Sequence, residues 1–196
     1  MRVFLAGASG VLGMRLVPLL LKDGHPVAGM TRSPQKVETL RSLGVEPVLC
    51  DVYDADVLCA AVQRFQPDVI IDQLTDLPDD ASLIPGAVFR NNRMRREGTA
   101  NLLGAARASG VNRVIAQSVA WSLPGESGAA TRDLERAVLE FGGVVIRYGQ
   151  LYGPGTYYTT ELPPPPRVHA DVAALRTMAT LGEPSGTIVT ITEGEP

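Results

Sequence analysis

Short apolar runs rich in valine and isoleucine recur along the chain and alternate with segments of helical periodicity. Runs of this length are typical of strands buried on both faces, and apolar residues three and four positions apart indicate helices with one buried face. Strands that alternate with helices predict an α/β fold with a doubly wound parallel sheet and helices on both of its faces. The predicted strands are residues 2–6, 27–30, 47–49, 68–72, 113–116, 144–147 and 187–191, and the predicted helices are residues 11–22, 34–43, 54–65, 87–109, 130–141 and 170–181.

The composition suits one domain with a well-buried core, because 45% of the 196 residues are hydrophobic. The net charge of −3 argues against a generally basic surface for nucleic acid or for an anionic membrane. No apolar run reaches the roughly 20 residues that a membrane helix needs, and we expect no signal peptide. Cys50 and Cys59 are too few for a disulfide framework and indicate buried thiols in a reducing cytoplasm.

Three glycines, Gly7, Gly10 and Gly13, lie between the first predicted strand and the first predicted helix, in the sequence GASGVLG. We expect a turn at Gly7, close approach of a ligand at Gly10 and tight packing of the helix at Gly13. Such a turn presents backbone N–H groups to a pyrophosphate at the helix N-terminus. A tight turn without a ligand is the alternative, but the strand before the glycines and the helix after them favour nucleotide binding.

The end of the second predicted strand carries cations where an acidic residue would bind the ribose hydroxyls of NAD. Arg32, Ser33 and Lys36, in the sequence GMTRSPQK, instead suit the 2′-phosphate of NADP. The charge pattern therefore favours NADP, with NAD as the alternative cofactor. A second interpretation is that Arg32 and Lys36 are simply solvated loop and helix residues.

With these features and several segments further along, the chain resembles the short-chain dehydrogenase/reductase superfamily, in its extended or atypical NAD(P)-dependent epimerase/dehydratase branch. The resemblance spans nearly the whole chain and implies a Rossmann-like fold. The matching segments are GASGVLG, TRSPQK, CDVYD, DVIIDQL, GTANLLGAARASGVNRVIAQS, VVIRYGQLYGPGT and RVHADVAAL.

The resemblance implies a set of cofactor contacts along the predicted strand ends. The glycine-rich turn would wrap the pyrophosphate, the residues after the third strand would flank the adenine, and those after the fourth strand would lie along the nicotinamide-side ribose. The implied residues are Gly7, Ala8, Ser9, Gly10, Val11, Leu12 and Gly13 for the pyrophosphate, Asp51 and Val52 for the adenine, and Leu74 and Thr75 for the ribose.

The chemistry of the family rests on a Tyr and a Lys four residues apart on the helix after the fifth strand. These positions are Ser127 and Thr131 here, so the resemblance implies that the usual dyad is lost. Ser118, at the end of the fifth strand, matches a serine that polarises the substrate in active members. Tyr148 and Tyr152 are further candidates for a catalytic hydroxyl, and the alternative for both is a packing role.

The resemblance also implies two parts of the chain: an NAD(P)-binding Rossmann-like domain over residues 1–150, and a reduced substrate lobe over residues 151–196 packed on the same domain. The partner would be a small molecule, and the helices around 87–109 and 130–141 match those that pair in dimeric relatives, which leaves a homodimer open. The basic cluster at 90–98 lacks stacking aromatics, and the acidic run at 76–80 lacks metal-ligand spacing, so we expect neither nucleic-acid binding nor a metal site.

The sequence leaves two main function classes open, beside a shortened paralogue that keeps the fold with weak or no ligand binding. The first is an oxidoreductase or epimerase/dehydratase-like enzyme that acts on a small carbonyl, hydroxyl or sugar-like substrate, with hydride moving between the nicotinamide and a substrate carbon. The second is a non-catalytic dinucleotide-binding sensor or regulatory protein. The missing dyad at Ser127 and Thr131 favours the second class, and the retained YGPGT segment favours the first.

Overall fold

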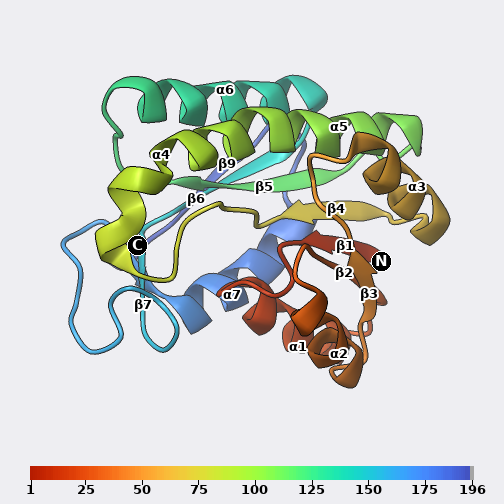
Figure 1. The fold of residues 1–196 in the computed structure, drawn as a ribbon, viewed down its shortest axis with the longest axis horizontal. Coiled ribbons are helices and arrows are strands. Elements are labelled where there is room, and N and C mark those ends of the chain that lie inside the picture. The colour runs from red at the N-terminus through yellow and green to blue at the C-terminus, as the bar shows by residue number, and fades with distance from the viewer. Residues whose placement is uncertain (195–196) are drawn as a thin grey trace.

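Seven parallel strands form one central sheet in the computed structural model, which describes residues 1–194 (Figure 1). Their spatial order is β3-β2-β1-β4-β5-β6-β9, so the chain builds one half of the sheet outward from β1 and then returns to β4 to build the other half. This order confirms the predicted Rossmann-like doubly wound α/β fold. The strands are β1 (Val3–Ala6), β2 (Val27–Thr31), β3 (Glu46–Leu49), β4 (Val69–Asp72), β5 (Val114–Val119), β6 (Val144–Tyr148) and β9 (Ile188–Ile191).

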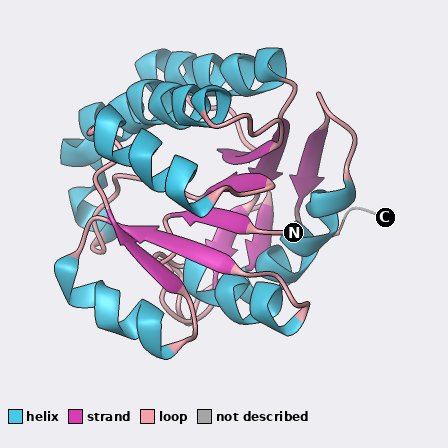
Figure 2. Cartoon of the chain, turned by 90° about the vertical axis from the view of Figure 1, so that its right-hand side faces the viewer, coloured by secondary structure: helices cyan, strands magenta, loops and turns pink. Residues whose placement is uncertain are grey.

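Helices cover both faces of the sheet, as Figure 2 shows. One face carries α1, α2 and α7, and the other carries α3, α4, α5 and α6 (Figure 1). Within residues 1–194, no helix combines the length and the apolar character that crossing a bilayer requires. The helices are α1 (Gly13–Lys22), α2 (Val37–Ser42), α3 (Ala55–Phe65), α4 (Ile84–Arg93), α5 (Thr99–Ala108), α6 (Gly125–Phe141) and α7 (Ala170–Ala179).

The apolar runs form strands because successive side chains enter two different cores. In β1, Val3 and Leu5 pack with residues of α1 and α7, whereas Phe4 and Ala6 pack with residues of α3 and α5. All four residues are fully buried. A run without polar positions is therefore the expected sequence of a strand in the middle of this sheet.

Several element boundaries differ from the prediction. The helix predicted over 87–109 is two helices, α4 and α5, joined by a π-helical turn at Met94–Gly98. The helix predicted from residue 130 begins at Gly125, and Gly128 in its first turns lies so close to Leu123 that a Cβ would meet the Leu123 carbonyl oxygen at 2.1 Å. Two strands of three residues, β7 (Gln150–Tyr152) and β8 (Arg167–His169), form a separate small sheet that the periodicity did not predict.

The sheet reverses its winding between β1 and β4, which are neighbours although β2 and β3 and the helices α1, α2 and α3 lie between them in sequence. Ligands of open parallel sheets bind beyond the carboxyl ends of the strands at such a reversal. The glycine-rich turn follows β1, and the segment from Gln73 follows β4. The fold therefore brings both predicted cofactor segments to one edge of the sheet.

The last residue of β4, Asp72, predicts a pH-dependent stability. It is 4% exposed, its carboxylate accepts a hydrogen bond from the Leu74 N–H at 2.9 Å, and burial raises its pKa from 3.8 to about 6. Because the folded state holds this proton more tightly than the unfolded state does, the carboxyl group penalises folding increasingly as the pH rises from about 4 to above 6. We compare the free energy of unfolding of Asp72→Asn with that of wild type. We expect this difference to shift in favour of the variant by about 3 kcal/mol between pH 4 and pH 8.

Urea unfolding of both proteins at the two pH values measures this change. Glu140→Gln, which neutralises an exposed carboxylate of α6, is the matched control and should give the same difference from wild type at both pH values. A pH-independent difference for Asp72→Asn would contradict the expectation.

Candidate functional site

The glycine-rich segment forms a tight turn between β1 and α1. Gly7 has a φ of +82°, and a Cβ at this residue would lie 2.7 Å from the backbone oxygen of Gln73. A Cβ at Gly13 would lie 2.2 Å from the backbone oxygen of Gly7. Both positions therefore require glycine, for the turn at Gly7 and for close packing of the helix start at Gly13, as the spacing predicts.

The backbone of this turn fits a bound phosphate. The N–H of Ala8 donates to the Met30 carbonyl at 3.1 Å. This bond fixes the position of the turn, and the N–H of Ala8 is not free to bind a phosphate. For the N–H groups of Val11 and Leu12, the residues at 1–194 provide no acceptor. Gly10 is exposed, and a Cβ there would meet only the Gly7 oxygen, at 3.3 Å, so the approach to these N–H groups is open. Free donors at a helix N-terminus suit a pyrophosphate.

Arg32, the residue predicted to bind a 2′-phosphate, pairs with an acid of the same protein. Its guanidinium donates to Asp76 at 2.8 Å, and Arg90 lies 3.7 Å from the other oxygen of that carboxylate. The hydrogen bond from Arg32 holds the pKa of Asp76 below its usual range. Arg32 follows β2 and is 53% exposed at its side chain, so it is neither a merely solvated residue nor a free cation.

The remaining predicted cofactor residues lie around the same edge of the sheet with different exposures. Asp51, Thr75 and Lys36 are exposed, and Ser33 and Leu74 are half-buried. Val52 is buried in the core with residues of α3 and α5, and its carbonyl accepts a hydrogen bond from Asn101 at 2.9 Å. The Leu74 carbonyl accepts a hydrogen bond from Gln117 at 2.8 Å, which ties the end of β4 to β5.

Ser118 lies inside the protein rather than at an open surface. It is 7% exposed, and its hydroxyl donates to the Glu135 carboxylate of α6 at 2.6 Å. Arg147 binds the same carboxylate at 2.6 and 2.9 Å. Burial disfavours the charged form of Glu135, but the hydrogen bonds from Arg147 and Ser118 outweigh it and hold its pKa below the usual range. Ser118 is thus part of a Ser-Glu-Arg network that cross-links β5, β6 and α6, with Ser118 and Glu135 buried and Arg147 partly exposed.

Tyr148 is also enclosed. Its side chain is 3% exposed, and its hydroxyl lies 2.5 Å from the Thr177 hydroxyl and accepts a hydrogen bond from Gln73 at 3.2 Å. Burial raises the pKa of this phenol to about 12. These contacts match the packing role that the sequence left open for Tyr148.

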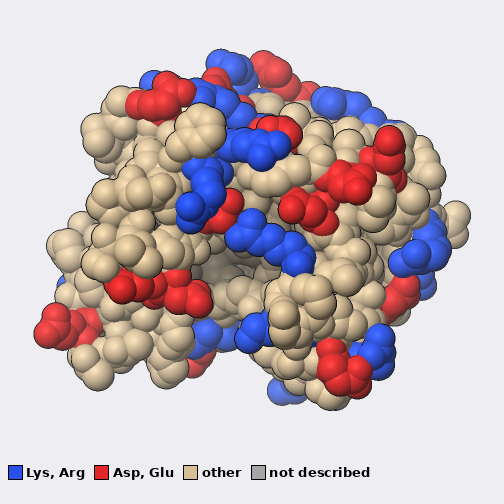
Figure 3. Space-filling model, in the orientation of Figure 1, with Lys and Arg blue, Asp and Glu red and all other residues tan. Residues whose placement is uncertain are grey.

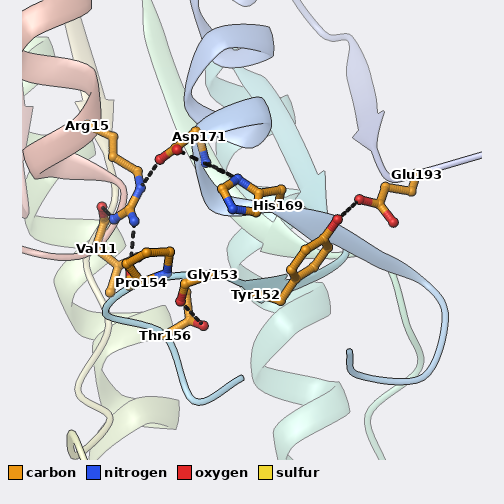
Figure 4. Close-up of polar contacts among 9 residues, drawn as sticks. All are labelled: Val11, Arg15, Tyr152, Gly153, Pro154, Thr156, His169, Asp171 and Glu193. Carbon is orange, nitrogen blue, oxygen red and sulfur yellow. Dashed lines mark hydrogen bonds and ion pairs between the residues drawn. The ribbon is translucent and has the colours of Figure 1, made fainter. Parts of the chain in front are cut away.

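Tyr152 is half-buried and lies in the small sheet formed by β7 and β8 (Figure 4). Its hydroxyl donates to Glu193, which raises the pKa of the phenol, and its ring lies edge-on to His169 with the ring centroids 5.1 Å apart. Among Ser118, Tyr148 and Tyr152, it is the residue with the most accessible side chain. A catalytic role for any of the three stays a prediction.

The positions of the usual dyad lie on α6, as the resemblance implies. Thr131 is buried, and its hydroxyl donates to the Ser127 carbonyl at 2.8 Å within the helix. An aliphatic hydroxyl does not exchange protons near neutral pH as a Tyr assisted by Lys does. Neither residue supplies the acid–base function of the family.

The sequence did not point to Arg15, which joins the glycine-rich turn to the C-terminal segment. Its guanidinium donates to the carbonyl of Val11 at 2.9 Å, to the carbonyl of Pro154 at 2.6 Å and to the Asp171 carboxylate at 2.6 Å (Figure 4). Three acceptors from three segments leave this side chain little freedom. Its position on the first turn of the helix was visible in the sequence, but its partners lie 139 and 156 residues away, beyond the reach of any local pattern.

Comparison with known proteins agrees with this geometry. A family model described as NAD(P)H-binding matches residues 7–140. A 3-diazoavenalumate denitrifying reductase from a Streptomyces species is 36% identical over 185 residues, which cover 82% of this chain and 60% of the reductase. A UDP-glucose 4-epimerase from Mycolicibacterium smegmatis is 33% identical over 139 residues, covering 64% of this chain and 41% of the epimerase. The chain thus spans less than two thirds of the length of these relatives.

Solved structures share the fold. The UDP-glucose 4-epimerase of Thermus thermophilus, in complex with NAD, superposes with a TM-score of 0.79 at 20% identity, covering 100% of this chain and 78% of the epimerase. The UDP-glucose 4-epimerase of Thermotoga maritima, with UDP-glucose, gives a TM-score of 0.80 at 16% identity and covers 100% of this chain and 78% of that protein.

The unequal surroundings of Gly10 and Gly13 predict opposite outcomes for the same substitution. Gly10→Ala places a methyl group on the open side of the turn, so we expect a melting temperature close to wild type and at least about tenfold weaker NADPH binding. Gly13→Ala places it 2.2 Å from the Gly7 oxygen, so we expect a loss of stability of about 2 kcal/mol or more. Thermal unfolding and fluorescence titration with NADPH measure both effects. Equal melting temperatures for the two variants would refute this assignment of roles.

Proposed function

The chain belongs to the NAD(P)H-binding family, and from this membership we propose that it is an NADP-preferring oxidoreductase for a small carbonyl, hydroxyl or sugar-like substrate. The observation that carries the proposal is the turn at Gly7–Gly13, which lies at the reversal of the sheet and leaves the N–H groups of Val11 and Leu12 without an acceptor among residues 1–194. A reductase among the relatives, at 36% identity, supports reduction over epimerisation.

In this proposal, different residues at the edge of the sheet bind different parts of the cofactor. The bound nicotinamide supplies hydride transfer, and the chain supplies position and electrostatics. The backbone of Ser9–Leu12 holds the pyrophosphate, Asp51 and Val52 flank the adenine, and Leu74 and Thr75 line the second ribose. The guanidinium of Arg32 then neutralises a 2′-phosphate, with Ser33 and Lys36 beside it.

The substrate side is assigned to the C-terminal segment, residues 151–194 in the part that the structure describes. Tyr152 supplies the polar contact to the substrate oxygen, and Glu193 orients its hydroxyl. Because the single O–H of Tyr152 is donated to Glu193, its oxygen offers a lone pair that accepts a hydrogen bond from a hydroxyl group of the substrate. The proposal includes a cytoplasmic location, where the thiols of Cys50 and Cys59, neither of them in a disulfide, stay reduced.

Cofactor titrations of the wild type and Arg32→Ala test the proposal. Wild type should bind NADPH more tightly than NADH, and Arg32→Ala should weaken NADPH by about tenfold with little change for NADH. Arg41→Ala, which removes an exposed cation of α2, is the matched control and should change neither affinity. An equal effect of Arg32→Ala on both cofactors would remove the 2′-phosphate assignment, and binding of neither cofactor to the wild type would overturn the proposal.

A turnover assay distinguishes the proposed enzymatic function from the non-catalytic sensor function. Oxidation of NADPH in the presence of a panel of small carbonyl compounds should be detectable by absorbance, and Tyr152→Phe should lower kcat by about tenfold or more. Ser127→Ala is the control, since we expect no contribution from this residue. Tight binding of NADPH without turnover of any substrate would favour the non-catalytic function instead.

A further inference from the structure

The ion pair between Arg32 and Asp76 lies across the proposed cofactor groove. β2 and β4 are the two neighbours of β1 in the sheet, and all three strands run in the same direction. Arg32 follows the end of β2 and Asp76 follows the end of β4, so their 2.8 Å contact spans the edge beyond β1. The glycine-rich turn occupies that edge. Figure 3 shows basic side chains gathered over the middle of this face, with acidic ones among them, above a hollow.

Contacts on both sides of the turn confirm that the pair is close to it. On the β2 side, the Ser9 hydroxyl lies 2.8 Å from the hydroxyl of Thr31, the residue before Arg32. On the β4 side, Gly7 packs against the backbone of Gln73. A dinucleotide that binds the turn and extends its 2′-phosphate to Arg32 therefore reaches a guanidinium that already has an anionic partner.

Asp76 has a second cationic neighbour, Arg90, with which it can pair when a phosphate binds Arg32. Arg90 lies 3.7 Å from the carboxylate oxygen that Arg32 does not bind. The Asp76 side chain is only 10% exposed, so loss of both cations would leave a poorly solvated charge, whereas the pair with Arg90 can shorten. The 3.7 Å separation is longer than a hydrogen bond and leaves room for this change.

The backbone around Asp76 is held in place, so the change can be confined to side chains. Its N–H donates to the Asn91 amide oxygen at 3.0 Å, inside the protein. Two residues further on, the Pro78 carbonyl accepts a hydrogen bond from the Tyr157 hydroxyl. Asp76 thus has a fixed backbone position between two arginines that come from different elements.

We propose that Asp76 sets the cofactor preference by competing with the 2′-phosphate of NADP for Arg32 and by passing to Arg90 when the phosphate binds. The inference rests on the proposed function, since it assumes the dinucleotide groove. To bind Arg32, the 2′-phosphate of NADPH must displace the Asp76 carboxylate, and the two negative charges then repel each other at close range. NADH has no phosphate at this position. Asp76 therefore lowers the preference for NADPH below what Arg32 alone would give.

The test compares the ratio of NADH to NADPH dissociation constants in wild type and Asp76→Asn by isothermal titration calorimetry. Asparagine keeps the size of the side chain and removes its charge, so we expect the ratio to rise by roughly fivefold, through tighter NADPH binding. Asp79→Asn removes an equal charge from an exposed residue of the same loop and should leave the ratio unchanged. A ratio within one protein is insensitive to the fraction folded, so a modest loss of stability does not obscure the result.

A double variant separates competition from a general charge effect. In Arg32→Ala, the further change Asp76→Asn should no longer raise the ratio if Asp76 acts through Arg32. An unchanged ratio in Asp76→Asn alone, or the same rise with and without Arg32, would overturn the inference while leaving the proposed function intact. If wild type binds neither cofactor, the proposed function fails; binding of NADPH to Asp76→Asn alone would then still support the competition, and binding to neither protein would reject both.

Discussion

Neither end of the glycine-rich turn has room for a side chain, because Gly13 at the start of α1 lies against the Gly7 carbonyl and Gly7 lies against the backbone of Gln73. This close approach fixes the direction of the helix and places its first N–H groups beyond the end of β1. Because Gly7 also packs on the backbone of Gln73, the same contact fixes where the segment after β4 begins. The ends of β2 and β4 then lie on either side of one turn, and Arg32 and Asp76 follow these two ends. The steric constraint on two glycines thus brings the Arg32–Asp76 pair beside the turn.

The arginine assigned to the cofactor phosphate is paired within the protein. A chain with a net charge of −3 has no general attraction for a phosphate ligand, so an anionic cofactor needs a local cation. Arg32 is such a cation, but its hydrogen bond to Asp76 means that the affinity for a phosphate depends on a difference between two anions and not on the charge of Arg32 alone. Because Arg90 lies beside the same carboxylate, taking Arg32 away from Asp76 costs less free energy than it would if Arg32 were the sole partner of Asp76. Under the proposed function, the cofactor preference therefore depends on three side chains: Arg32 after β2, Asp76 after β4 and Arg90 on α4.

The sequence was sufficient for the order of strands and helices and for the glycine-rich turn, because those depend on local periodicity and on the spacing of glycines. It was insufficient for the side-chain partners. The alternation along β5 puts Ser118 on the same face as Ala116, toward α6, and the alternation along β6 puts Tyr148 on the same face as Ile146, so the directions were implicit in the strands. Glu135, however, is 17 residues from Ser118, and Asp76 is 44 residues from Arg32, so only the packed structure brings these pairs together. The strands β7 and β8 were missed because three residues carry no measurable period.

The loss of the Tyr and Lys dyad changes what the rest of the site must contribute. Ser127 and Thr131 offer no acid near neutral pH, and the hydroxyls of Ser118 and Tyr148 are enclosed. Under the proposed function, catalysis then depends mainly on the orientation of the reacting groups, which contributes through the entropy of a preassembled geometry. Arg15 supports such a geometry, because its guanidinium holds the pyrophosphate turn at Val11 and the loop of the substrate side at Pro154 at the same time. Under the proposed function, Arg15 therefore fixes the segment that would hold the cofactor relative to the loop that would face the substrate.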